Sequence, residues 1–174
     1  RTSVRGGSYG TSQASAAVIG GDKDINFSAS LSRFETTGFS AYRQGSEDDA
    51  HRYLAGALRV GSTKWDSTHI DFVSRLNSSY TELDFSPTDS DDGDYFVDGV
   101  HSVNALTVDH IFNSKLSARV VAGHDYSDRR YFNSGGVAMQ WGSVFKIAEF
   151  TRWAPRERHE VEFGPSYRRD AAGK

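Results

Sequence analysis

Apolar residues occupy every second position along much of this chain, and the clearest case is the segment INFSASLSRF, which runs from Ile25 to Phe34. Within it, Ile25, Phe27, Ala29 and Leu31 alternate with an asparagine and three serines. A period of two places consecutive side chains on opposite sides of an extended backbone. The segment therefore predicts a β-strand with one apolar and one polar face.

The same alternation recurs along the chain and predicts about eight strands in total. These strands are expected within residues 8–19, 25–34, 52–60, 70–77, 105–112, 116–123, 137–142 and 160–168. The spacing of an amphipathic helix is nearly absent, and seventeen glycines with few prolines are typical of a β-rich chain with many turns. We therefore expect one all-β domain over residues 1–174.

The connections between these strands alternate between short and long. The short ones are expected at Gly20–Asp24, Gly61–Ser67 and Phe112–Lys115, and the long polar ones at Glu35–His51, Glu82–His101 and Asp125–Gly136. An up-and-down barrel that crosses an outer membrane sorts its connections in this way, with short turns on the periplasmic side and long loops outside. The pattern predicts an antiparallel up-and-down transmembrane β-barrel.

The residues on the two strand faces indicate which solvent the apolar face meets. The polar face carries Ser, Asn, Thr, Asp and Arg, as a wet interior does, and aromatic residues gather near the strand ends, as at a membrane interface. Five charged residues share this polar face and are expected to pair with one another: Arg59, Arg75, Arg119, Asp71 and Asp109. Two alternatives remain: a complete small eight-stranded OmpA-like barrel with a structural or adhesive role, and a soluble lipocalin-like carrier.

Composition excludes several classes of function. The formal net charge of −3 argues against a nucleic-acid binder, and the absence of cysteine excludes disulfides and thiol chemistry. The chain contains no run of 18 apolar residues, so no transmembrane helix is predicted. The GGSYG segment (Gly6–Gly10) matches the pattern of a nucleophilic serine turn, but no helix is expected after it, so we predict no enzymatic activity.

Three segments resemble parts of the TonB-dependent outer-membrane receptors. RGGSYGTSQASAAVIGG (Arg5–Gly21) resembles the first barrel strand of that family, just after its plug domain. FETTGFSAYRQGSEDDAHRYLAGALRVG (Phe34–Gly61) is similar to the next two strands and the loop between them, particularly in the cobalamin transporter branch. RHEVEFGPSYRRD (Arg158–Asp170) resembles a recurring strand of the family.

This resemblance implies active uptake of cobalamin, a ferric siderophore or a similar bulky nutrient across the bacterial outer membrane. The chain would be the N-terminal part of a barrel of about 22 strands, without the plug and the segment that engages the TonB complex. Its partners would be the lipid bilayer, the nutrient and, through the plug, TonB. Ligand contacts are expected in the outer loops, at Tyr42, Arg43, Tyr95, Phe96, Arg129 and Arg130.

Two acidic clusters are candidates for calcium binding. One lies in DSDDGDYFVDG and comprises Asp89, Asp91, Asp92 and Asp94, whose spacing around a glycine approaches that of a calcium loop. The other comprises Asp48 and Asp49 in the preceding long loop. The cobalamin branch uses loop aspartates to bind calcium, so the resemblance implies the same role here. The alternative is a pair of solvated acidic loops.

Overall fold

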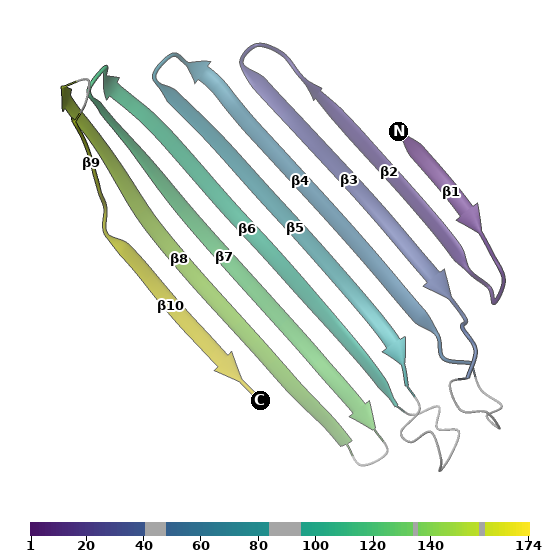
Figure 1. Cartoon of the computed structure of the whole chain (residues 1–174). Coiled ribbons are helices and arrows are strands. Elements are labelled where there is room, and N and C mark those ends of the chain that lie inside the picture. The colour runs from purple at the N-terminus through teal and green to yellow at the C-terminus, as the bar shows by residue number, and fades with distance from the viewer. Residues whose placement is uncertain (41–47, 84–94, 134–135, 157–158) are drawn as a thin grey trace.

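Ten strands follow one another along the chain and form one antiparallel sheet in the computed structural model (Figure 1). The structure describes residues 1–40, 48–83, 95–133, 136–156 and 159–174. The strands are β1 (Thr2–Gly6), β2 (Ser12–Gly21), β3 (Ile25–Thr36), β4 (His51–Trp65), β5 (Thr68–Glu82), β6 (Phe96–Asn113), β7 (Leu116–Asn133), β8 (Gly136–Arg156), β9 (His159–Phe163) and β10 (Ser166–Gly173). Each of β1 to β8 pairs with the next, and β9 and β10 both pair with β8.

The all-β antiparallel prediction is confirmed, but the predicted number of strands is wrong. Strand β1 was missed because TSVRG is too short to show a period of two. The segment expected as one strand over 160–168 is divided into β9 and β10. Between these two strands, a Cβ on Gly164 would overlap the carbonyl group of Glu149, so only glycine fits there.

The three tight turns lie where the sequence places them, at one end of the sheet, which we call the turn end. In the turn between β2 and β3, the carboxylate of Asp22 accepts hydrogen bonds from the backbone N–H groups of Asp24 (2.8 Å) and Ile25 (2.9 Å). These two bonds favour the charged carboxylate and lower the pKa of Asp22 below its ordinary value. The turn is thus fixed by a local side-chain cap.

At the opposite end, the loop end, the prediction of a long connection over 125–136 is wrong. Strand β7 continues to Asn133 and β8 begins at Gly136. The last third of β7 carries polar residues on both faces, so the period of two is lost from the sequence although the strand continues. Cross-strand pairs hold it instead, including Arg130 with Asp98, whose Nε and Oδ1 atoms are 3.0 Å apart.

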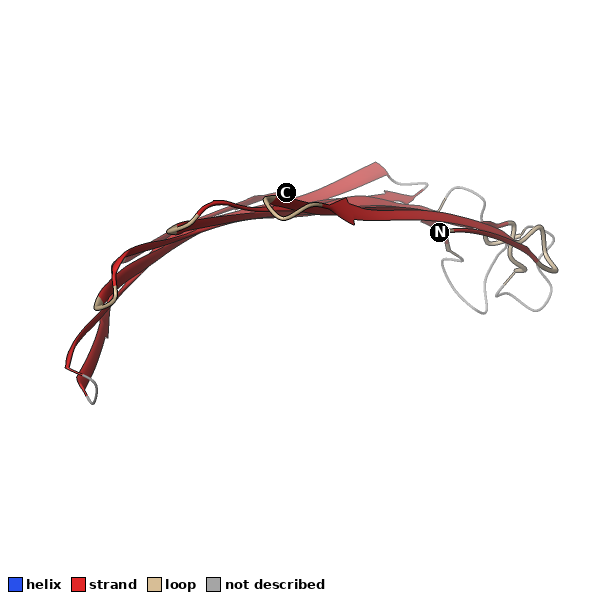
Figure 2. Cartoon of the chain, turned by 90° about the horizontal axis from the view of Figure 1, so that it is seen from above, coloured by secondary structure: helices blue, strands red, loops and turns tan. Residues whose placement is uncertain are grey.

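The sheet is a single curved layer without a second layer against either face (Figure 2). Among the described hydrophobic side chains only that of Ala148 is buried, with 5% of its surface exposed. The chain exposes 12,314 Å², whereas a compact soluble protein of its mass exposes about 8,400 Å². The described chain therefore has no interior of its own.

The sheet is open within the described residues. Strand β1 pairs only with β2, and β10 pairs only with β8, so each leaves one edge unpaired. What is established is therefore an open antiparallel sheet.

Candidate functional site

Most of the large apolar residues on strands β3 to β8 lie on the same face of the sheet. Directly paired residues in neighbouring strands point to the same side, and the register joins Phe27 to Val60, Phe72, Leu106 and, beyond them, the rest of the row. We call the following residues of this face the apolar band: Ile25, Phe27, Ala29, Leu31, Leu54, Leu58, Val60, Ile70, Phe72, Leu76, Leu106, Val108, Ala118, Val120, Ala122, Phe145 and Ile147.

Large side chains of the apolar band are exposed rather than packed against protein. The exposed fractions are 39% for Phe27, 55% for Leu31, 40% for Leu58 and 41% for Leu106. Soluble monomers rarely expose a contiguous apolar surface of this extent. Such a face requires an apolar medium or partner outside the described chain.

The boundary of the apolar band toward the loop end lies at different heights on different strands. On β3 the boundary falls at Ser32, between Leu31 and Arg33. The directly paired residues of successive strands lead from Ser32 to Ser127 on β7. On β7, however, the face becomes polar at His124, so the boundary lies at Gly123, four residues nearer the turn end. The boundary does not shift evenly, because Leu54 of the band pairs with Arg33 on β3, so on β4 the band reaches nearer the loop end. On β8 the apolar residues continue up to Val137.

Charged and aromatic residues replace the apolar band at the loop end of the same face. We call this group the loop-end belt, and it comprises Arg33, Glu35, Arg52, Tyr80, Glu82, Phe96, Asp98, Arg130 and Phe132. Each of the nine lies an even number of residues from a band residue on the same strand. The register therefore places all nine on the face of the apolar band.

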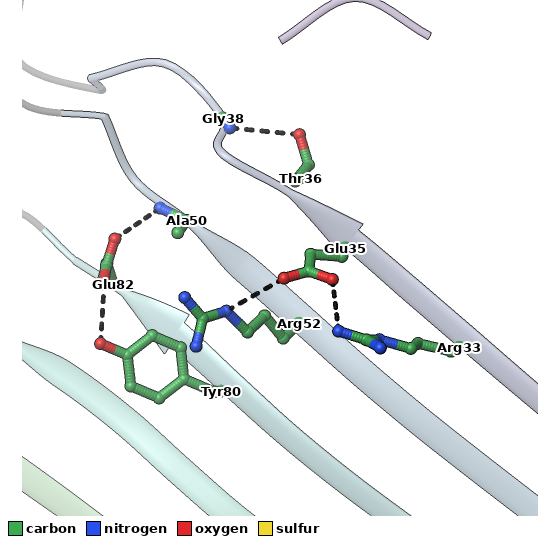
Figure 3. A network of polar contacts seen from close by, with 8 residues as sticks. All are labelled: Arg33, Glu35, Thr36, Gly38, Ala50, Arg52, Tyr80 and Glu82. Carbon is green, nitrogen blue, oxygen red and sulfur yellow. Dashed lines mark hydrogen bonds and ion pairs between the residues drawn. The ribbon is translucent and has the colours of Figure 1, made fainter. Parts of the chain in front are cut away.

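Ion pairs and hydrogen bonds link the part of the loop-end belt on β3 to β5 (Figure 3). Glu35 lies between two arginines, with its oxygens 2.6 Å from Arg33 Nη2 and 3.6 Å from Arg52 Nε. Tyr80 donates its hydroxyl hydrogen to Glu82 Oε1 at 2.8 Å, and the other Glu82 oxygen accepts the backbone N–H of Ala50, also at 2.8 Å. These contacts tie the base of the connection between β3 and β4 to β5.

Aromatic contacts continue the loop-end belt from β5 to β7. The Arg52 guanidinium carbon lies 5.4 Å from the centre of the Tyr80 ring, which lies 5.1 Å from the Phe96 ring. Phe96 in turn stacks on Phe132, with 4.2 Å between ring centres. The side chains of the belt thus satisfy one another, in contrast to those of the apolar band.

The opposite face of the sheet carries ion pairs along its length, together with apolar residues such as Val73, Val121 and Phe150. Near the turn end, Arg59 pairs with Asp71 and Arg119 with Asp109, each at 2.6 Å, which confirms the expected pairing for four of the five residues. Nearer the loop end, His101 Nε2 lies 3.2 Å from Asp125. A hollow of about 580 Å³ lies beside the Arg119 pair. This face is therefore mixed, but it is more polar than the face of the apolar band.

The structure divides the expected ligand residues between the two faces. Phe96 and Arg130 belong to the loop-end belt, whereas Arg129 lies on the polar face, where its Nη1 is 3.3 Å from the Tyr131 hydroxyl. Tyr95 precedes β6, and its carbonyl accepts the N–H of Leu83. Tyr42 and Arg43 lie outside the described residues. The described candidates therefore do not form one site.

The calcium prediction concerns residues that the structure describes only in part. Asp48 and Asp49 are described, whereas Asp89, Asp91, Asp92 and Asp94 lie outside the described residues. Within the ranges that are described, no three His, Asp or Glu side chains are placed to hold one metal ion. The calcium site stays a prediction.

As a group, the loop-end belt was not predicted from the sequence, although Phe96 and Arg130 were expected ligand residues and a signal for others was present. Arg33 and Glu35 continue the odd-numbered register of Phe27 and Leu31, so the strand continues while its residues change from apolar to charged. If the period of two is extended through the charged residues, Arg33 and Glu35 are identified as neighbours on the apolar face.

No helix capable of spanning a membrane occurs in the part of the chain that is described. Comparisons of the chain with models of protein families, with curated proteins and with solved structures found no match.

Proposed function

We propose that the chain is a segment of a transmembrane β-barrel in the bacterial outer membrane, with its apolar band against the lipid acyl chains and its polar face toward the interior. The observation that carries this proposal is an apolar face with exposed large side chains on most strands of a sheet with no core among the described residues. Exposed apolar area is unfavourable in water by about 25 cal/mol per Å². A bilayer removes that cost without any further protein layer.

Strand length and strand order agree with this assignment. The strands β3 to β8 contain from 12 to 21 residues, and a tilted strand needs about 9–11 to cross the hydrocarbon layer. Each strand is thus long enough to cross and to extend beyond the bilayer. The two longest connections, 37–50 and 83–95, both lie at the loop end, which is therefore assigned to the cell exterior.

Within this membrane assignment, we propose uptake of a bulky nutrient as the function. The chain would form part of a TonB-dependent receptor for cobalamin, a ferric siderophore or a related ligand. Support comes from the resemblance of three segments to that family and from the paired charges on the polar face, which suit a hydrated or plugged interior. Binding and gated passage require no catalytic group, so no enzymatic activity is assigned.

The two alternative functions fit the sheet less well. A soluble lipocalin-like carrier needs a sealed apolar interior, which the described residues lack. A complete eight-stranded barrel needs a sheet that closes on itself, whereas β1 and β10 each keep a free edge. Both remain outcomes of the experiments below.

Adjacent single cysteines on β4 test the membrane assignment, because the chain contains no cysteine of its own. A spin label at Leu58→Cys should be accessible to oxygen, which concentrates in lipid, and inaccessible to a polar nickel complex. The label at Ala57→Cys, on the opposite face, should show the reverse. A label at residue 58 that neither reagent reaches would indicate a sealed protein core and would overturn the assignment.

Uptake by whole cells tests the transport assignment. Deletion of the gene should abolish accumulation of radiolabelled cobalamin or of one of a panel of ferric siderophores, and deletion of TonB should have the same effect. Unchanged uptake of every ligand, together with lipid contact at Leu58, would favour a structural or adhesive barrel instead.

A further inference from the structure

We propose that two copies of the protein associate side by side in the membrane through a polar patch on the face of the apolar band. The patch, which we call the polar island, lies on β5 to β8 and comprises Ser74, Ser102, Asn104, His124, Tyr126 and Ser143. The inference goes beyond transport, and it rests on the proposed function only for the membrane that surrounds the sheet.

The polar island forms two adjacent rows across the strands. In the first row, Asn104 on β6 pairs directly with Ser74 on β5 and with His124 on β7. The second row, nearer the loop end, consists of Ser102, Tyr126 and Ser143. Each residue lies an even number of positions from a band residue on its own strand, so the whole island shares the face of the band.

Exposed apolar residues surround most of the polar island. They are Leu58, Leu76, Val100, Leu106, Trp141 and Phe145. Toward the loop end, Asp128 interrupts this border between Val100 on β6 and Trp141 on β8. Because apolar residues return beyond the island on β5, β6 and β8, the island is a polar gap within an apolar face rather than the margin of that face.

The height of a membrane places the polar island inside the hydrocarbon layer. On β7, the apolar side chains of this face begin at Leu116, directly after the turn, and end at Ala122. At a rise of about 3.3 Å per residue and a tilt of about 40°, this stretch is about 15 Å high. The apolar belt of an outer-membrane barrel is about 25 Å high. The layer therefore extends beyond Ala122 and includes His124 and Tyr126.

The polar island has hydrogen-bonding groups left over after its internal contacts. Ser74 donates its hydroxyl hydrogen to Asn104 Oδ1 at 2.8 Å, and His124 Nε2 lies 3.0 Å from Ser143 Oγ. The Asn104 amide nitrogen, His124 Nδ1 and the Tyr126 hydroxyl make no hydrogen bond to any described residue. Hydrocarbon offers them no partner, and an unpaired polar group there is strongly unfavourable. The island therefore needs a polar partner within the membrane.

A second copy of the same island supplies such a partner. The island carries no charge while His124 is neutral, so two islands can face each other without repulsion. Asn104 has two amide donors and a second lone pair on its oxygen, so two Asn104 side chains on a two-fold axis can bond to each other. An axis along the membrane normal gives a closed dimer and keeps the loops of both copies on one side. The exposed apolar residues around the island then pack at the edge of the contact.

Disulfide formation in phosphatidylcholine vesicles, at a low ratio of protein to lipid, tests this contact. The chain has no cysteine, so a single cysteine reports on one position. Asn104→Cys should give a disulfide-linked dimer, because the two residues lie at the axis. Leu31→Cys, on the same face of β3, is the control and should stay monomeric. Monomers with both variants, or equal dimer formation with both, would overturn the inference.

Dilution of the cysteine-free protein in the same vesicles measures the dimer without cross-linking. Asn104→Leu should raise the Kd of the dimer about 3- to 20-fold, as expected for the loss of a side-chain hydrogen bond within a membrane. Thr107→Leu, on the opposite face of the same strand, is the matched control and should leave the Kd unchanged. Unchanged association of Asn104→Leu would overturn the inference.

A spin label at Asn104→Cys identifies any other occupant of the polar island. Full access of oxygen to the label would show lipid over the island, and access of the polar nickel complex would show water. Either result, or a cross-link in cells only to a different protein, would overturn the inference. A label at Phe27→Cys, on β3 and away from the island, separates this outcome from the membrane assignment, because its contact with lipid does not depend on a dimer. Loss of the uptake proposal would leave the dimer unchanged.

Discussion

The apolar band and the loop-end belt occupy the same face of the same strands, yet only the belt side chains find interaction partners within the sheet. In the belt, Glu35 pairs with two arginines and Phe96 stacks on Phe132, so these side chains find their partners within the sheet. In the band, Leu31 and Leu58 are about half exposed and have no layer of protein above them. The belt residues have partners within the sheet, whereas the band requires an apolar medium or partner outside the described chain.

This difference shows what a period of two does and does not reveal. Alternation assigns each residue to a face, and it continues unchanged from Phe27 through Leu31 to Glu35. The change from apolar to charged residues along one face marks where the surroundings change. In the proposed function, that change is the boundary of the hydrocarbon layer.

Arginine substitutions in the band should have the largest effect and should depend on distance from the belt. In a bilayer, Leu58→Arg should lower the free energy of unfolding by about 2–4 kcal/mol, as arginine does at the midplane of a barrel, and Leu54→Arg, beside Arg33, by about 0–1 kcal/mol. Urea unfolding from phosphatidylcholine vesicles measures both. Equal costs at the two positions would contradict the boundary.

The second prediction perturbs the belt and leaves the band unchanged. Gly38 has a φ of 74°, and a Cβ there would overlap the carbonyl group of Asp49. Gly38→Ala should therefore cost about 1–3 kcal/mol and displace Ala50, whose N–H bonds to Glu82.

Hydrogen exchange should then accelerate at Ala50 and Glu82, but not at Leu58 in the band. Gly142→Ala is the matched control, because nothing lies within 4 Å of a Cβ at that position. If the exchange of Leu58 accelerated as much as that of Ala50, the two regions would be one cooperative unit.

Removal of the central charge of the belt should have a smaller effect. Glu35→Gln loses the ion pairs with Arg33 and Arg52, whose side chains are 66% and 61% exposed. Exposed pairs contribute about 0–1 kcal/mol and are screened by salt. The cost should fall toward zero in 1 M salt, and a large cost that salt does not change would mean that the belt is shielded from water.

Much of the sheet could be predicted from the sequence because one simple rule governs it. The faces of β3 to β8 and the three tight turns follow from the period of two and from turn residues such as Gly20 and Gly21. The extension of β7 to Asn133 could not be predicted, because Asp128 and Arg130 carry no apolar signal, and Arg130 pairs with Asp98 on another strand.

The candidate site was less accessible to sequence reasoning. Phe96 and Arg130 were chosen because they lie beside a long loop, but only the register shows that they share a face and that Arg129 does not. Contacts such as Phe96 with Phe132 join residues far apart in the chain. A single sequence contains no information about that register beyond the alternation itself.

The smallest expected effect lies at the turn end, beyond the opposite margin of the band, where stabilisation is local. The pKa of Asp22 is lowered below its ordinary value of 3.8 by the N–H groups of Asp24 and Ile25. Its contribution to stability is therefore full above pH 3.8 and is lost as the pH falls through the lower value of the folded state.

Asp22→Ala should destabilise the protein slightly at pH 7, and the difference from the unmodified chain should shrink in acid. Hydrogen exchange of the Asp24 and Ile25 amides, at pH 7 and in acid, measures this difference in stability. Because these bonds are confined to one turn, the amides of the loop-end belt should show no change. A response there would mean that the two ends of the strands are coupled through the apolar band, which has no side-chain network to carry such a coupling among the described residues.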